Sequence, residues 1–127
     1  MERRFYLGLG ILIALLILGI LSAAVMKFLH IPGAEALQTA SVLALQGDSE
    51  KAITIAQDTK HNWERWRSLT ASFADHSPID DTENLFAEME VFAAAGENVH
   101  FAACCRELSN MLEAMYEAHS FTLWNLL

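Results

Sequence analysis

The sequence is poor in the residues and motifs that mark several large classes of protein. It holds only 2 cysteines in 127 residues, too few for a disulfide framework. It has no glycine-rich phosphate loop and no nucleophile elbow, and no segment alternates with period two for long enough to predict a strand. Basic residues are also scarce, with 8 Lys and Arg against 16 Asp and Glu. This balance argues against nucleic acid as a partner and against electrostatic docking on anionic lipid.

Charge is missing altogether from one long stretch near the start of the chain. Phe5 to Met26 contains no charged residue, Arg3 and Arg4 precede it, and Lys27 follows it. About twenty apolar residues at 1.5 Å each cross a hydrocarbon core of roughly 30 Å. We therefore expect a helix that spans the cell membrane once. The two arginines before the span predict a cytoplasmic amino terminus and an extracytoplasmic C-terminal domain.

Two further interpretations of this stretch stay open. Ser22-Ala23-Ala24 resembles the cleavage site of a secretory signal, although signal h-regions run about 7 to 15 residues and this run is longer. An uncleaved anchor is therefore the favoured prediction. Gly10 with Ala14, and Gly19 with Ala23, are small residues four apart that let two spanning helices approach closely. A homo-oligomer joined through the anchor is one candidate assembly.

A proline-glycine pair follows the apolar stretch. In His30-Ile31-Pro32-Gly33 the proline disfavours helix at the residue before it, so we expect the first helix to end here with a bend at the membrane surface. This divides the chain into a transmembrane anchor over residues 1–31 and an exported acidic helical domain over residues 32–127. From Ile31 onward there are fifteen Asp or Glu against five Lys or Arg, a balance of about minus ten that favours solubility.

The exported part carries apolar residues at helical spacings of three and four in four segments. Gly47 and Gly96 predict the ends of the first and third helices, because glycine readily adopts the left-handed conformation that closes a helix. Short polar side chains predict the starts of the other helices. These caps are Asp48 or Ser49 for the second helix, Asp80 or Asp81 for the third, and Asn98 for the fourth. The expected helices run over residues 35–46, 49–74, 82–95 and from 98 onward.

A shift of 49 residues aligns the two halves of this part. It places Gly47-Asp48-Ser49 on Gly96-Glu97-Asn98, and Val42-Leu43-Ala44 on Val91-Phe92-Ala93. Each half therefore repeats a short helix, a glycine-acid turn and a long helix, which together make an αα-hairpin. We expect hairpins over residues 34–74 and 80–124, packed as one bundle. The predicted fold is all-α, with one N-terminal transmembrane helix followed by a small bundle of these two hairpins.

Cys104 and Cys105 are the first candidates for chemistry. Adjacent helical residues point about 100° apart, so the pair cannot share one tetrahedral metal without breaking the helix. The 49-residue shift places them on Ile55 and Ala56, and we interpret both cysteines as buried packing residues. His100 with Cys104 is the only properly spaced ligand pair, and nothing near it supplies a second pair. We expect no metal and no other cofactor.

Trp63 and Trp66 continue the apolar stripe of the second predicted helix, so core packing is their favoured interpretation. The alternative is a stacking surface for a base or a sugar, helped by Arg65 and Arg67. If this helix contacts a partner, its exposed flank of Glu64, Arg65 and Arg67 is the predicted contact region. The carboxylates form no isolated pair in apolar surroundings, as acid–base catalysis would prefer, so we expect no enzyme and no catalytic residues.

Together these features resemble a family of small single-pass membrane proteins of unknown function from Gram-positive bacteria. The resemblance rests on the spanning helix and the acidic helix pairs, and on the short motifs Gly47-Asp48, Trp63 with Trp66, and Leu123-Trp124-Asn125-Leu126-Leu127. It covers nearly the whole chain. It implies a bacterial cell-membrane location and a helical outer domain, and it brings no activity to carry over.

Two functions from different classes fit the sequence. The first is a membrane-tethered interaction or scaffolding module that offers a groove or face to another protein of the cell envelope. The second is an exported ligand- or metal-binding sensor built on His100, Cys104 and nearby carboxylates, whose stability would depend on the metal. We expect the first, with the partner's identity and the oligomeric state left open.

Overall fold

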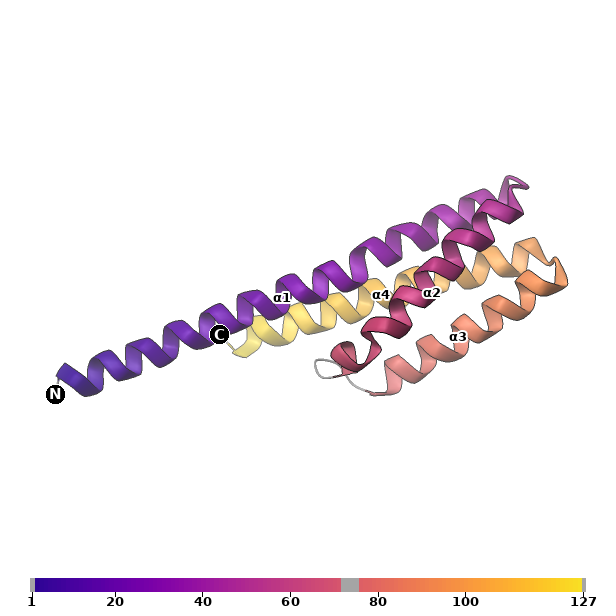
Figure 1. The fold of residues 1–127 in the computed structure, drawn as a ribbon. Helices are drawn as coiled ribbons and strands as arrows, with labels where there is room; N and C mark the ends of the chain where they lie inside the picture. Colours follow the sequence, from indigo (N-terminus) through magenta and orange to yellow (C-terminus); the bar gives the residue numbers. More distant parts are fainter. Residues whose placement is uncertain (1, 72–75, 127) are drawn as a thin grey trace.

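The chain folds into four α-helices. The structure, a computed structural model, describes the backbone of residues 2–71 and 76–126 and the side chains of residues 2–68 and 77–118. The helices are α1 (Glu2–Leu45), α2 (Ser49–Ala71), α3 (His76–Ala95) and α4 (Asn98–Leu126), as Figure 1 shows. The described residues contain no strand. The prediction of an all-α fold with a long apolar N-terminal helix is therefore confirmed.

The predicted break at His30 to Gly33 is wrong. α1 is a single helix of 44 residues with Pro32 inside it. Proline in a helix interior removes a hydrogen bond and costs about 3 kcal/mol. Packing outweighs this cost, because Met26 and Leu37 are completely buried on either side of the proline and burying such a side chain contributes about 1.5 to 3 kcal/mol. The predicted anchor and the first predicted helix of the outer domain are thus one continuous element.

The 49-residue repeat is present in the two tight turns. Gly47 has a φ of 90° and Gly96 a φ of 73°, which residues with a side chain rarely adopt. In both turns the glycine N–H donates to the carbonyl three residues earlier, and the next N–H donates to the carbonyl five residues earlier, at 2.9 to 3.3 Å. This pair of bonds is the Schellman arrangement. α2 begins directly after Asp48, which is one of its two predicted caps. α4 begins directly after Glu97, so its cap position is one residue before the predicted cap, Asn98.

The boundaries of α2 and α3 differ from the predicted ones. α2 ends at Ala71 in the described chain, and the predicted continuation to residue 74 lies outside the described residues. α3 begins at His76, six residues before the predicted start, so Asp80 and Asp81 lie inside the helix and do not cap it. Pro78 is compatible with this earlier start because it stands in the first turn, where its missing N–H would have no helical partner.

The bundle is built around the antiparallel pair α1 and α4, which share the most extensive contact (Figure 1). α2 packs beside α1 and α3 beside α4, while the contact between α2 and α3 is much smaller. The buried Ser109 hydroxyl of α4 donates to the Ala34 carbonyl of α1 at 2.7 Å and fixes the register of the central pair. The largest fully buried side chains are Phe86, Met26, Leu37, Ile79, Met89, Leu108 and Leu112.

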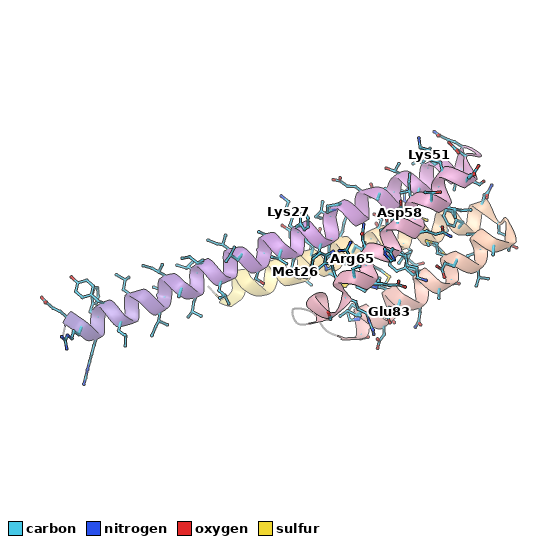
Figure 2. The ribbon with its side chains drawn as sticks, in the orientation of Figure 1. Met26, Lys27, Lys51, Asp58, Arg65 and Glu83 are labelled. Carbon is cyan, nitrogen blue, oxygen red and sulfur yellow. The ribbon has the colours of Figure 1, made fainter. Side chains whose placement is uncertain are left out.

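The first half of α1 projects from this bundle with its apolar side chains exposed (Figure 2). The most apolar 18-residue segment of α1 is only 6% buried. Phe5, Leu7 and Leu18 are each more than 60% exposed. Among the described residues, α1 is the one helix that is long and apolar enough to cross a membrane.

Candidate binding groove

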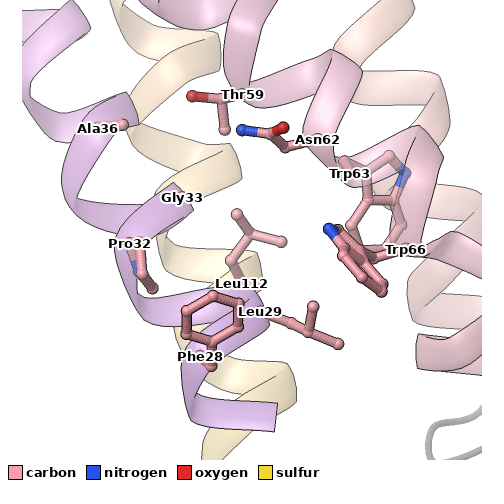
Figure 3. A pocket seen from close by; sticks show the side chains of 10 residues that line it. All are labelled: Phe28, Leu29, Pro32, Gly33, Ala36, Thr59, Asn62, Trp63, Trp66 and Leu112. Atoms are coloured by element: carbon pink, nitrogen blue, oxygen red, sulfur yellow. The ribbon is translucent and has the colours of Figure 1, made fainter. Parts of the chain in front are cut away.

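A groove of about 350 Å³ lies where α1, α2 and α4 meet (Figure 3). We call it the α1/α2/α4 groove. Its lining is mostly apolar, and Asn62 brings an amide group to it, whereas the Thr59 hydroxyl donates to the Ile55 carbonyl of its own helix. The full lining is Phe28, Leu29, Pro32, Gly33, Ala36, Thr59, Asn62, Trp63, Trp66 and Leu112. An apolar cleft with few polar groups is typical of a binding site.

Gly33 lets the three helices come together at the floor of the groove. A Cβ atom at this position would lie 3.2 Å from the Leu112 Cδ1 atom and 3.5 Å from the Thr59 Cγ2 atom. The absence of a side chain therefore allows α4 and α2 to approach α1 closely. Pro32, next to it, is exposed and forms part of the α1 wall, as Figure 3 shows.

The two tryptophans of α2 have different surroundings. Trp63 is 7% exposed, and its ring lies 6.3 Å from that of Phe86 and 6.2 Å from that of His30. The prediction of core packing is confirmed for Trp63. It is wrong for Trp66, which is 42% exposed. Three residues along a helix turn the side chain by about 300°, so Trp66 stands about 60° away from Trp63, at the edge of the buried stripe.

The indole nitrogens of these residues point in different directions. In Figure 3 the nitrogen of Trp63 points away from the groove, and that of Trp66 points toward it. The Trp63 nitrogen is buried and has no hydrogen-bond acceptor within the described part of the chain. The Trp66 indole therefore adds a hydrogen-bond donor to the apolar wall of the groove.

The three predicted contact residues, Glu64, Arg65 and Arg67, are all exposed on α2. Arg65 is the one closest to the groove, because its guanidinium carbon lies 6.0 Å from the centre of the Trp66 ring. Glu64 pairs with Lys60 at 3.7 Å, and Arg67 forms an ion pair with Glu83 of α3. The structure thus brings Arg65 to the rim and directs Arg67 toward α3.

A second ion pair joins α2 to α3 on the same side. Lys60 Nζ lies 2.7 Å from Glu90 Oε1. The hydrogen bond to Glu90 raises the pKa of Lys60, against a smaller opposing effect of burial. With the pair of Arg67 and Glu83, this bond holds the outer side of α2 against α3. The position of the tryptophan-bearing helix therefore depends on α3 as well as on α1.

The two cysteines are packing residues, as predicted. Cys104 is 6% exposed and Cys105 is fully buried, like Ala56 at the position equivalent to Cys105 in the 49-residue repeat. Burial raises the pKa of Cys104 to about 11 and that of Cys105 to about 12, with a smaller contribution from Glu88 and Glu107 in the first case. Both thiols are therefore protonated at neutral pH and are poor nucleophiles.

The predicted ligand pair of His100 and Cys104 does not form a recognisable metal centre. His100 is exposed, and its ring stacks on that of Phe92 with the centroids 5.0 Å apart. Within the described part of the chain, no three His, Cys, Asp or Glu side chains come close enough to hold a metal ion.

The α1 side of the groove was missed in the sequence. His30 to Gly33 were predicted to form a bend at the membrane surface, because a proline-glycine pair usually breaks a helix. A signal was nevertheless present. Buried positions Met26, His30, Ala34 and Leu37 follow one another at helical spacings of three and four straight through the proline.

The fold and groove define a class of small all-α proteins in which one long apolar N-terminal helix continues into a helical bundle. The chain belongs to the family described as a domain of unknown function, DUF4363, whose model matches residues 19–126. This confirms the expected membership of a family of unknown function, while the bacterial source and the membrane location stay predictions. The match includes residues 19–26, the last third of the apolar stretch. Neither a curated protein nor a solved structure matches the chain significantly.

Proposed function

We propose that this protein is a membrane-anchored interaction module of the bacterial cell envelope. In this proposal α1 spans the membrane, and the bundle binds a juxtamembrane segment of another membrane protein in the α1/α2/α4 groove. The observation that carries the proposal is the groove itself. It combines the half-exposed Trp66 with apolar walls. Its first lining residue is Phe28, which follows Lys27 at the end of the uncharged stretch.

The exposure of the first half of α1 supports an anchor. A row of exposed Leu, Ile and Phe side chains over five turns is far larger than the apolar patches that monomers show to water. Residues 5–26 span about 33 Å at 1.5 Å per residue, which matches the hydrocarbon core of a bilayer. Arg3 and Arg4 at the start of the helix favour a cytoplasmic amino terminus.

The cover on α1 favours an anchor that is not cleaved. Gly19, Ser22 and Ala23 are partly buried, and Met26 is completely buried. Gly19, Ser22 and Ala23 belong to the stretch that cleavage at Ser22-Ala23-Ala24 would cut or remove, and Met26 would then stand close to the new amino terminus. Losing them would expose the part of the bundle that covers them, so an uncleaved chain fits the packing better.

The position of the groove indicates the kind of partner. A partner held in the same bilayer presents its first turn outside the membrane at the level of Phe28 and Leu29, and tethering both chains raises their effective concentration. Phe28 is 73% exposed and Trp66 is 42% exposed, so apolar side chains are available on both walls. Arg65 beside Trp66 suits an acidic residue at the end of such a segment.

The alternative of a metal or ligand sensor at His100 has less support. Cys104 is buried and protonated, and His100 stacks on Phe92. The protonated thiols also favour a role without catalysis. We therefore place the binding function in the groove and propose no catalytic residue.

Photocrosslinking in intact membranes tests the proposal. A photoreactive residue replaces Arg65 in the full-length chain, and mass spectrometry maps the captured peptide. The matched control carries the same residue at Glu88, which is exposed on α3 away from the groove. We expect one envelope protein to be captured through an apolar juxtamembrane peptide at position 65 only, and Trp66→Ala to abolish the capture. Equal capture at both positions, or capture unaffected by Trp66→Ala, would refute the groove as the binding site.

A further inference from the structure

We infer that the last turns of α4 enter the outer leaflet of the membrane beside α1, so that the protein contacts lipid through two helices. The inference rests on the proposed anchoring of α1. It concerns a different part of the molecule from the groove, and its occupant is the hydrocarbon of the bilayer.

The register of α1 and α4 gives the level that each residue of α4 reaches. The two helices are antiparallel, and the bond from Ser109 to Ala34 marks one shared level. Because both helices rise 1.5 Å per residue, Glu117 lies at the level of Met26, and Leu126 at the level of Ile17. Figure 1 agrees, since α4 continues beyond the bundle and ends beside the middle of the apolar half of α1.

The burial of α1 confirms that another helix lies against this part. From residue 2 to residue 18 every described side chain is exposed. From Gly19 onward a covered stripe begins, at Gly19, Ser22, Ala23, Val25 and Met26, with helical spacing. Met26 lies on the side of α1 nearest α4, while Lys27 points outward (Figure 2). α4 is the helix that lies beside this stripe, so its last turns accompany the second half of the apolar stretch.

Charge disappears from both helices at the same level. Along α1 from the bundle toward the amino terminus, Lys27 is the last charged residue before the uncharged residues 26 to 5. In α4, Glu117 is the last acidic side chain, and the residues after it contain no Asp, Glu, Lys or Arg: Ala118-His119-Ser120-Phe121-Thr122-Leu123-Trp124-Asn125-Leu126-Leu127. Glu117 and Lys27 stand one residue apart in level. One plane perpendicular to α1 therefore separates the charged bundle from two segments, residues 5–26 and 118–126, that hold no Asp, Glu, Lys or Arg side chain, as the surface of a bilayer would.

The alternative arrangements are less favourable. If α1 spans the bilayer over residues 5–26, the end of α4 at the level of residues 17–26 cannot remain in water without drawing α1 out of the lipid. Leaving the uncharged residues 5–16 alone in the membrane would span about 18 Å, too short for a hydrocarbon core of roughly 30 Å. In the proposed arrangement, with α1 spanning the bilayer and α4 inserted beside it, Trp124 lies about 12 Å below the plane of Lys27, within the outer half of the bilayer.

Quenching of tryptophan fluorescence tests this placement in the full-length chain. The protein is reconstituted in phosphatidylcholine vesicles, with a phosphatidylcholine brominated midway along its acyl chains as the lipid quencher and iodide as the aqueous one. Comparison of the wild-type chain with Trp124→Phe gives the signal of Trp124, and Trp66→Phe is the matched control for a tryptophan outside the plane. We expect the Trp124 signal to be quenched several-fold more by bromolipid than by iodide, and the Trp66 signal to show the opposite order.

The outcomes separate this inference from the proposed anchor. A chain that floats with the vesicles but whose Trp124 signal is quenched mainly by iodide keeps its anchor and overturns the insertion of α4. A chain that does not float overturns the anchor, and the insertion with it. As a second measurement, Leu123→Glu should raise the iodide quenching of Trp124 while the melting temperature of the bundle stays unchanged. Unaltered quenching in Leu123→Glu would also count against insertion.

Discussion

At the scale of single residues, the two tryptophans of α2 separate stability from binding. Trp63 is buried against Phe86 and His30, so Trp63→Ala should lower the free energy of unfolding by about 3 to 5 kcal/mol. Trp66 is 42% exposed, and Trp66→Ala should cost about 1 kcal/mol, near the centre for point substitutions. Chemical denaturation of the full chain in detergent measures both values. Equal losses would show that Trp66 belongs to the core after all.

The thiols predict a dependence of stability on alkaline pH. The pKa of Cys104 is raised to about 11 and that of Cys105 to about 12, from an ordinary value of 9.0, because burial disfavours the thiolate. A raised pKa means that the neutral thiols contribute their full stability below about pH 8.5, and that this contribution is lost as the pH rises toward the folded-state values. The free energy of unfolding should therefore fall between pH 8.5 and 11.

A matched variant isolates the cysteines in that experiment. The salt-bridged Lys60 also has a raised pKa and loses its charge at high pH, so the wild-type slope contains its contribution. The double variant Cys104→Ala, Cys105→Ala keeps Lys60 and should show a flatter dependence over the same range. Denaturation curves for the two proteins at pH 8 and pH 10 give the comparison, and identical slopes would contradict the burial of the thiols.

At the scale of elements, Pro32 lies inside α1 and destabilises it, although the helix stays continuous. Pro32→Ala restores the missing backbone donor in a helix interior and should raise the free energy of unfolding by about 1 to 3 kcal/mol. Pro78→Ala is the control, because Pro78 stands in the first turn of α3 and its replacement should change little. Both values come from denaturation in detergent. A loss of stability in Pro32→Ala would mean that the proline ring contributes more to the groove than it costs the helix.

Gly33 controls how closely the three helices pack. Gly33→Leu places a large side chain where a Cβ atom already lies 3.2 Å from Leu112, so it should cost about 1 to 3 kcal/mol by overpacking. Gly33→Ala needs only a small movement of the flexible end of Leu112 and gains up to about 1 kcal/mol of helix propensity. We expect the alanine variant to be close to wild type in thermal melting and the leucine variant to melt lower. A leucine variant as stable as the alanine variant would argue against the close approach of α4.

The sequence predicted the helices and turns better than it predicted how the helices pack together. The 49-residue repeat located both glycine turns, because Gly47 and Gly96 are needed wherever a helix closes in the left-handed conformation. The break at Pro32 was wrong because local proline chemistry was weighed without the packing of α2 and α4 on both sides. The groove escaped prediction for the same reason. Its walls come from three helices, and the exposure of Trp66 depends on how α2 packs against α1. The apolar periodicity of a single helix contains no information on that packing.

At the scale of the whole molecule, the charges and the apolar helix together predict its orientation. The bundle carries every Asp and Glu except Glu2, whereas Arg3 and Arg4 lie at the opposite end of α1. The positive-inside rule then predicts a cytoplasmic position for Glu2 and an extracytoplasmic one for Lys51, in the first turn of α2. With this predicted orientation, the α1/α2/α4 groove would lie on the outer surface, within reach of the proposed envelope partner.

A membrane-impermeant maleimide tests that orientation in intact cells. The native thiols of Cys104 and Cys105 should react little with the maleimide, because both are buried and their raised pKa values leave them protonated. Lys51→Cys and Glu2→Cys each add one exposed thiol, at opposite ends of α1. We expect the first to be labelled in intact cells and the second only after permeabilisation, with an intact mass that retains the first 24 residues. Labelling of Glu2→Cys in intact cells would reverse the orientation and move the groove to the cytoplasmic side, and loss of the first residues would identify a cleaved signal instead of an anchor.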